Sequence, residues 1–162
     1  MTRRCIIFAV LAVLWCGTIF MLSGEKAEES SETSGFFVDL VCDIFVPDLD
    51  ELPEDRQAEI KDNITFVIRK GAHFTAYGIL GALSFGAFGF IKRRKLHAAA
   101  AVGIAALYSV SDEIHQSFVG GRSCEVRDML IDTCGALTFL LIILLIIRIT
   151  DKKRTKSEAA GT

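Results

Sequence analysis

The sequence predicts an all-α protein, an integral membrane bundle of four transmembrane helices with an amphipathic outer loop, in a single domain over residues 1–162. Two observations predict this fold. Apolar residues occur in four blocks, each near the roughly 20 residues that cross a hydrocarbon core, whereas a soluble domain interleaves apolar and polar residues. Charged residues, 23% of the chain, lie mostly between these blocks. Helices are expected because a segment in hydrocarbon must satisfy its own backbone polar groups.

The first predicted span covers residues 5–22 and contains no charged residue. Arg3 and Arg4 precede it, as they do in a cleaved signal peptide, but the block exceeds the roughly 7–15 residues of a signal core. Trp15 stands where a lipid-attachment site before Cys16 needs a small residue. We therefore expect a retained membrane helix.

The remaining three spans are predicted at residues 71–91, 96–118 and 129–149. The second has polar residues only near its start, and the third is apolar until Asp112. The fourth is interrupted only by Asp132 near its start. Each is long enough to cross a hydrocarbon core of about 30 Å.

The distribution of basic residues predicts the orientation of these spans. Eleven of the 18 lie on one side: Arg3, Arg4, Lys92, Arg93, Arg94, Lys95, Arg148, Lys152, Lys153, Arg154 and Lys156. The others are spread over longer segments on the opposite side. The positive-inside bias therefore places both termini, including the tail 150–162, in the cytoplasm and the loop 23–70 outside.

The outer loop 23–70 divides into parts of different composition. Residues 25–35 are rich in serine and glutamate and are expected to be mobile, whereas residues 36–45 are apolar and predict a short helix on the membrane surface. Two prolines bracket a turn over 47–53, and an amphipathic helix from Glu54 is expected to lead into the second span. Packing of both helices over the bundle is an equally good alternative.

The composition limits the other chemistry that this chain offers. Its five cysteines are Cys5, Cys16, Cys42, Cys124 and Cys134, without a C-x-x-C pair or zinc-like spacing. Three lie in apolar blocks as small hydrophobic residues, and a disulfide between the two outer ones, Cys42 and Cys124, stays open. No basic stripe with aromatic residues indicates nucleic acid, and no glycine-rich loop indicates a phosphate-containing cofactor.

Ionisable and polar residues gather at the outer ends of the last three spans. They are Lys70, His73 and Tyr77 on the second, Asp112, Glu113, His115 and Gln116 on the third, Arg122 in the next loop, and Arg127, Asp128 and Asp132 on the fourth. A charge at membrane depth costs about 2.5–3.5 kcal/mol, so such a cluster predicts a functional site. The alternative is a network that only holds the helices together, at about 0.6–2 kcal/mol per contact.

Two kinds of chemistry fit these residues. Two imidazoles and a carboxylate are common metal ligands, which makes a metal site one interpretation of His73, His115, Asp112 and Glu113. Alternatively, a histidine oriented by an aspartate is a general base or nucleophile. In that case an anionic head group is held by the basic side chains of Lys70, Arg122 and Arg127. Lys70 and Arg127 are equally well explained as residues that extend to the membrane surface.

Five strings stand at these positions: residues 69–77 (RKGAHFTAY), 111–118 (SDEIHQSF), 121–122 (GR), Asp128 and 132–135 (DTCG). In order and spacing they resemble the VanZ-like family of bacterial membrane proteins. Gly120 departs from the family, which usually has proline there, and Cys124 with Glu125 lies in a loop that is usually simpler. The resemblance implies a multi-pass protein of the bacterial cytoplasmic membrane with a role in the cell envelope. The family's namesake is associated with low-level resistance to the glycopeptide teicoplanin.

Three functional hypotheses follow. In the first, an outward-facing polar pocket binds or modifies an anionic lipid or lipid-linked wall component. Its catalytic candidates are His73, Asp112, Glu113 and His115, and its substrate-binding candidates are Lys70, Tyr77, Gln116, Arg122, Arg127, Asp128 and Asp132. In the second, a non-enzymatic envelope protein limits glycopeptide access to its target, and residues 36–45 matter as much as the cluster. A proton-coupled transporter is disfavoured, since the inner halves of the spans hold no ionisable residue to carry the proton onward.

Overall fold

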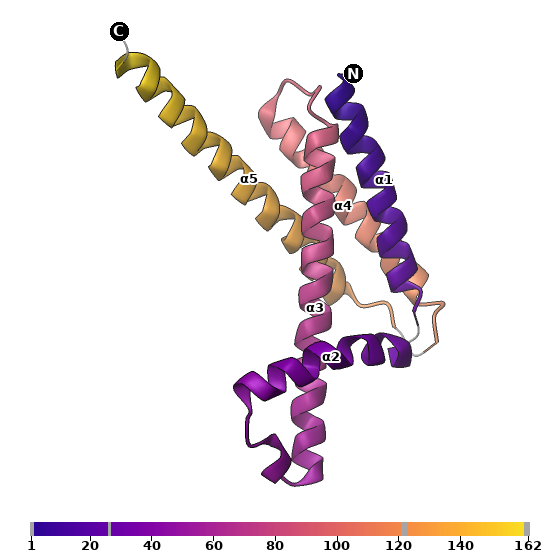
Figure 1. The fold of residues 1–162 in the computed structure, drawn as a ribbon. Coiled ribbons are helices and arrows are strands. Elements are labelled where there is room, and N and C mark those ends of the chain that lie inside the picture. Colours follow the sequence, from indigo (N-terminus) through magenta and orange to yellow (C-terminus); the bar gives the residue numbers. More distant parts are fainter. Residues whose placement is uncertain (1, 26, 121–122, 161–162) are drawn as a thin grey trace.

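The computed structural model of the protein describes residues 2–25, 27–120 and 123–160, which form five α-helices and one short 3-10 helix (Figure 1). These are α1 (Arg3–Ser23), α2 (Ala27–Phe45), η1 (Leu49–Glu51), α3 (Glu54–Ala87), α4 (Arg94–Gln116) and α5 (Val126–Ala160). The described ranges contain no strand. The prediction of an all-α fold is therefore confirmed.

Two of these helices are long and apolar enough to cross a membrane. They are α1 and residues Val126–Thr155 of α5, each of which contains an 18-residue stretch with a mean hydropathy of 2.6. α3 and α4 are less apolar because they carry most of the polar cluster and many small residues. The four predicted blocks are thus helical over most of their length, but α3 ends at Ala87 and α4 at Gln116, before the predicted ends at 91 and 118. Two helices are candidate spans by length and composition, and the membrane assignment of α3 and α4 stays a prediction.

The hydrophobic core lies where four helices meet around α3. Its buried members are Ile19 of α1, Tyr77 and Leu80 of α3, Ala105 of α4 and Ala136 of α5. The indole N–H of Trp15 in α1 donates a hydrogen bond to the Ala76 carbonyl of α3 over 2.8 Å. Small residues at the crossings allow the backbones to approach closely, which is how helices associate in membranes.

The crossing of α3 and α5 depends on glycine. A Cβ atom built on Gly135 of α5 would collide with the backbone of Phe74 in α3. One built on Gly81 of α3 would lie 3.0 Å from the Cα of Ala136. Beyond this crossing, the C-terminal half of α5 runs away from the other helices (Figure 1). Its large apolar side chains are exposed, among them Leu145, Ile146 and Ile149.

The segment between α1 and α3 is more ordered than the sequence predicts. α2 begins at Ala27, so residues 27–35, predicted to be mobile, form the first turns of a helix. A helix already formed over residues 36–45 extends at low cost, because propagation is favourable once a helix has nucleated and glutamate is a good helix former. The predicted helix from Glu54 is confirmed, since α3 runs without a break from Glu54 to Ala87.

α2 has two apolar faces with different environments. Val38 and Cys42 are buried against the N-terminal half of α3 at Ile60 and Ile64. The other side of the helix is exposed, with Phe36 at 73% and further apolar residues at Phe37, Leu40, Ile44 and Phe45. All five cysteines are free, so the structure has no disulfide between Cys42 and Cys124.

Candidate functional site

The structure brings most of the predicted polar residues together at the end of the bundle near α2. Asp112 and Glu113 of α4 and Asp132 of α5 are 3%, 0% and 0% exposed, respectively. Gln116 and Tyr77 are also buried there. Buried carboxylates need hydrogen-bond or ionic partners, so the partners of each define what it does.

Asp112 connects three helices through its side chain. One carboxylate oxygen accepts a hydrogen bond from the Ser23 hydroxyl at the end of α1. The other accepts from the Tyr77 hydroxyl of α3 over 3.0 Å and from the Gln116 amide over 3.2 Å. Both oxygens are occupied by side chains of the protein, which assigns Asp112 to holding α1, α3 and α4 together.

Asp132 has a different set of partners. Its Oδ2 accepts a hydrogen bond from the Ser109 hydroxyl of α4 over 2.7 Å. Its Oδ1 lies 3.6 Å from Nδ1 of His73 and has no hydrogen-bond partner in the described part of the chain. The buried carboxylate of α5 therefore faces the imidazole of α3 with one oxygen still free to accept.

Glu113 anchors the segment that follows α4. Its Oε2 accepts a hydrogen bond from the backbone N–H of Glu125 over 2.8 Å, and its buried Oε1 has no partner within the described ranges. Asp128, Asp132 and His73 are close enough to act on it electrostatically. Glu113 thus fixes the start of α5 while its second oxygen remains among other acidic groups.

Lys70 and Arg127 form the outer rim of the cluster. The Lys70 ammonium is paired with Asp128, and Arg127 is paired with Glu125 over 2.9 Å. Both cations also lie over the ring of Phe66, at 5.2 Å and 5.0 Å from its centre. These groups surround a cavity of about 280 Å³, lined by Phe66, Arg69, Lys70, Gln116, Ser123, Glu125, Arg127 and Asp128.

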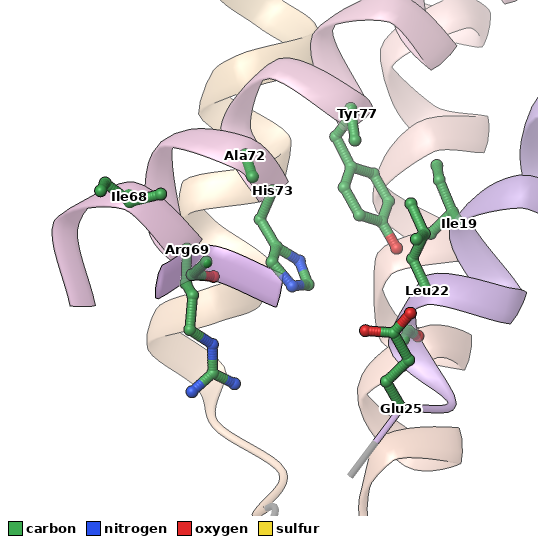
Figure 2. Close-up of a pocket in the computed structure, with 11 residues that line it drawn as sticks. Ile19, Leu22, Glu25, Ile68, Arg69, Ala72, His73 and Tyr77 are labelled. Carbon is green, nitrogen blue, oxygen red and sulfur yellow. The ribbon is translucent and has the colours of Figure 1, made fainter. Parts of the chain in front are cut away.

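A second cavity, of about 180 Å³, opens between α1 and α3. Its walls are largely apolar, formed by Ile19, Leu22, Ile68, Ala72 and Ala76, and its polar lining residues are Ser23, Glu25, Ser34, Arg69, His73 and Tyr77. Figure 2 shows the His73 ring and the Tyr77 hydroxyl on the cavity side of α3, where Arg69 also lines the cavity. No described residue forms an ion pair or a side-chain hydrogen bond with Arg69. This unpaired cation lines both cavities.

Not all of the predicted site residues join this arrangement. His115 stacks on Phe20 of α1 with ring centres 4.1 Å apart, and its buried Nδ1 has no described hydrogen-bond partner. It does not line either cavity. Arg122 lies outside the described residues. Among the residues that the structure describes, no group of three or more His, Cys, Asp or Glu side chains is placed to hold a metal ion, so the metal interpretation gains no support there.

Sequence reasoning missed several participants. Ser109 lies one helical turn before Asp112, and this spacing would have placed it on the same face as the cluster. Arg69 directly precedes Lys70 but was not assigned to the site. Ser23 and the backbone N–H of Glu125 carry no local signal, because their roles depend on which helix ends meet in the fold.

The sequence model of the VanZ/LLP1 family matches residues 8–148, which is most of the chain. The chain belongs to the VanZ/LLP1 family. No curated protein and no solved structure gives a significant match. The VanZ/LLP1 match runs from α1 to the second half of α5 and includes every residue of the two cavities. Together with the two long apolar helices, membership in the VanZ/LLP1 family indicates a membrane protein.

Proposed function

We propose that this protein is a multi-pass protein of the bacterial cytoplasmic membrane, spanned by α1, the second half of α3, α4 and α5. The start of α1, the end of α5 and the α3–α4 connection lie at the same end of the structure (Figure 1). This is also the end where the basic residues concentrate, which supports a cytoplasmic location. The exposed apolar side chains of α1, such as Val13 at 71% and Met21 at 77%, support contact with lipid.

The site is proposed to bind the anionic head group of a lipid or lipid-linked wall component from the outer face. The observation that carries this proposal is the cavity between α1 and α3, in which apolar walls lie beside the unpaired guanidinium of Arg69. Arginine is suited to phosphate and carboxylate because its planar donors form paired hydrogen bonds. Apolar walls next to such a cation favour a ligand that has both a chain and a charge.

His73 is the residue through which this pocket would transfer a proton. It lines the cavity, and Asp132 lies behind it on the side of Nδ1. A histidine oriented by a carboxylate is the arrangement of a general base or nucleophile. Binding is the proposed function of the site, and His73 is its candidate acid–base group.

A second candidate function is a non-enzymatic envelope role, in which the protein limits glycopeptide access to its target. The observation that favours it is the exposed apolar side of α2, where Phe36 and Phe37 are 73% and 55% exposed. Such a surface is suited to the membrane interface or to a partner in the envelope. In this case α2, rather than the cavity, would carry the activity.

Teicoplanin susceptibility separates the two candidates. A susceptible Gram-positive host would express wild type, His73→Gln, the double variant Phe36→Ser/Phe37→Ser, or His97→Gln. The last variant is the matched control, because His97 stacks on Phe85 at the opposite end of α3, with ring centres 3.9 Å apart, and lines neither cavity. Membrane abundance would be compared by blot.

The pocket proposal predicts that wild type and His97→Gln raise the inhibitory concentration and that His73→Gln does not. Loss of the effect only in the α2 variant would support the second candidate. If expression of wild type leaves the teicoplanin inhibitory concentration unchanged, this result would contradict a glycopeptide role for either surface.

A further inference from the structure

A third cavity lies at the opposite end of the molecule from the polar cluster, beside the diverging half of α5. It has a volume of about 340 Å³ and is lined by Arg94 of α4 and by Leu144, Leu145 and Arg148 of α5. No residue of the outer cluster contributes to it. Its chemistry is therefore independent of the proposed outer pocket, and it depends only on α4 and α5 lying in the membrane.

The lining of this cavity, an open groove, combines two exposed arginines with an exposed apolar surface. Such a combination rarely has a role only in folding. Arg94 and Arg148 are both exposed, and neither forms an ion pair or a side-chain hydrogen bond with any described residue. Between them lie two leucines, of which Leu145 is 57% exposed. Two unpaired guanidinium groups thus flank an apolar surface that no other helix of the chain covers in the described structure.

A membrane cannot leave such a groove empty, since the hydrocarbon region excludes water and voids are unfavourable. The apolar leucines fit acyl chains, and the two arginines fit a phosphate between them. A helix of a second copy would match the leucines but would leave the arginines without a counter-charge. A zwitterionic lipid supplies a phosphate but adds a competing cation.

We propose that the groove lined by Arg94, Leu144, Leu145 and Arg148 is a binding site for an anionic phospholipid of the adjacent leaflet. Its phosphate lies between the two guanidinium groups and its acyl chains cover Leu144 and Leu145. The bound lipid fills the widening space between α4 and the second half of α5. It thereby stabilises the position of a helix whose C-terminal half runs away from the other helices (Figure 1).

The test is native mass spectrometry of the full chain, released from detergent with phosphatidylglycerol or with phosphatidylcholine of identical acyl chains. The variant Arg94→Gln/Arg148→Gln removes both cations of the groove. Its matched control is Lys95→Gln/Lys153→Gln, which removes equal charge from the same two helices at positions that do not line the groove. Arg69→Gln, in the outer cavity, separates this site from the proposed function.

Wild type, the lysine control and Arg69→Gln are expected to retain a phosphatidylglycerol molecule in preference to phosphatidylcholine. Each arginine in contact with an anionic lipid contributes roughly fivefold in affinity, so the double arginine variant should bind about 30-fold more weakly. Equal retention by the arginine and lysine variants would overturn the proposal. A complex with the mass of two chains and no bound lipid would also overturn it, since a second copy would then occupy the groove.

Discussion

The carboxylate of Asp132 in α5 lies behind the imidazole of His73 in α3, with Oδ1 3.6 Å from Nδ1 and no other described partner for that oxygen. The other carboxylate oxygen of Asp132, Oδ2, accepts a hydrogen bond from the Ser109 hydroxyl of α4. Three helices thus contribute to the position of one histidine at the wall of a cavity. The crossing of α3 and α5 is what brings the two groups together, so the packing of these helices determines the geometry of the site.

The glycine crossing gives the first prediction. Gly135→Ala places a methyl group against the backbone of Phe74, which cannot move aside without separating α3 from α5. The free energy of unfolding should fall by about 1–3 kcal/mol, as in other overpacked contacts. Unfolding by dodecyl sulfate in mixed micelles measures it.

Gly103→Ala is the control for this prediction, because a Cβ atom at Gly103 of α4 meets no atom within 4 Å. It should leave stability unchanged or raise it slightly, since alanine is the better helix former. Equal effects of the two substitutions would show that the close approach of α3 and α5 is not required for folding.

The pair of Lys70 and Asp128 gives the second prediction. Their side chains are only 22% and 13% exposed, so the removal of either one leaves a poorly hydrated charge. Lys70→Met and Asp128→Asn should each destabilise the protein, and the double variant should recover part of the loss. The coupling free energy in a double-mutant cycle is expected at about 1–3 kcal/mol.

The same cycle on Arg56 and Glu59 provides a comparison. This pair lies in the N-terminal half of α3, with side chains 60% and 57% exposed. Because solvent screens exposed charges, the coupling free energy of this pair should be below about 1 kcal/mol. If the Lys70 pair shows no larger coupling than the exposed pair, Lys70 extends to the membrane surface and does not hold α5 against α3.

Asp112 gives the third prediction, which separates structural from functional carboxylates. Asp112→Asn replaces one acceptor by a donor that faces the hydroxyl of Ser23 or the donors of Tyr77 and Gln116. Stability should fall by about 1–3 kcal/mol, the effect of leaving buried donors without an acceptor. Thermal unfolding in detergent, with the exposed Asp39→Asn as control, measures it.

His73→Gln should leave stability close to that of wild type in the same experiment. The His73 side chain is 24% exposed, its Nδ1 lies 3.6 Å from Asp132, and it forms no hydrogen bond with a described residue. A loss of stability in His73→Gln as large as that in Asp112→Asn would contradict the division of roles between these residues.

Much of the fold could be predicted from the sequence because the membrane imposes simple rules. The length of the apolar blocks predicted a helix at each of the four. The polar residues at the ends of three blocks predicted a cluster at one depth along the bundle. What could not be predicted is which side chain faces which. Both histidines lie at the polar end of a predicted span, yet His115 stacks on Phe20 while His73 faces Asp132. That choice depends on the rotation of each helix.

The outer segment shows the other limit of sequence reasoning. The serine- and glutamate-rich residues before Phe36 have the composition of a mobile linker, but they continue the helix that packs Val38 and Cys42 on α3. Long-range packing of one part of a helix therefore decided the conformation of the other part, as it often does when propensity is weak.

The most direct test of the proposed pocket is the binding of farnesyl phosphate to the detergent-solubilised protein, followed by the fluorescence of its single tryptophan. Trp15 donates a hydrogen bond to Ala76, which lines the cavity, so its emission reports on this site and not on the arginine groove at the other end. Wild type and Arg56→Gln should show the same saturable change in fluorescence with farnesyl phosphate.

Arg69→Gln should bind farnesyl phosphate about tenfold more weakly or worse, the loss expected for a charge-assisted hydrogen bond. Wild type should bind uncharged farnesol more weakly by the same factor. Equal affinities of Arg69→Gln and Arg56→Gln, or of farnesol and farnesyl phosphate, would contradict the assignment of this cavity as an anionic-lipid site.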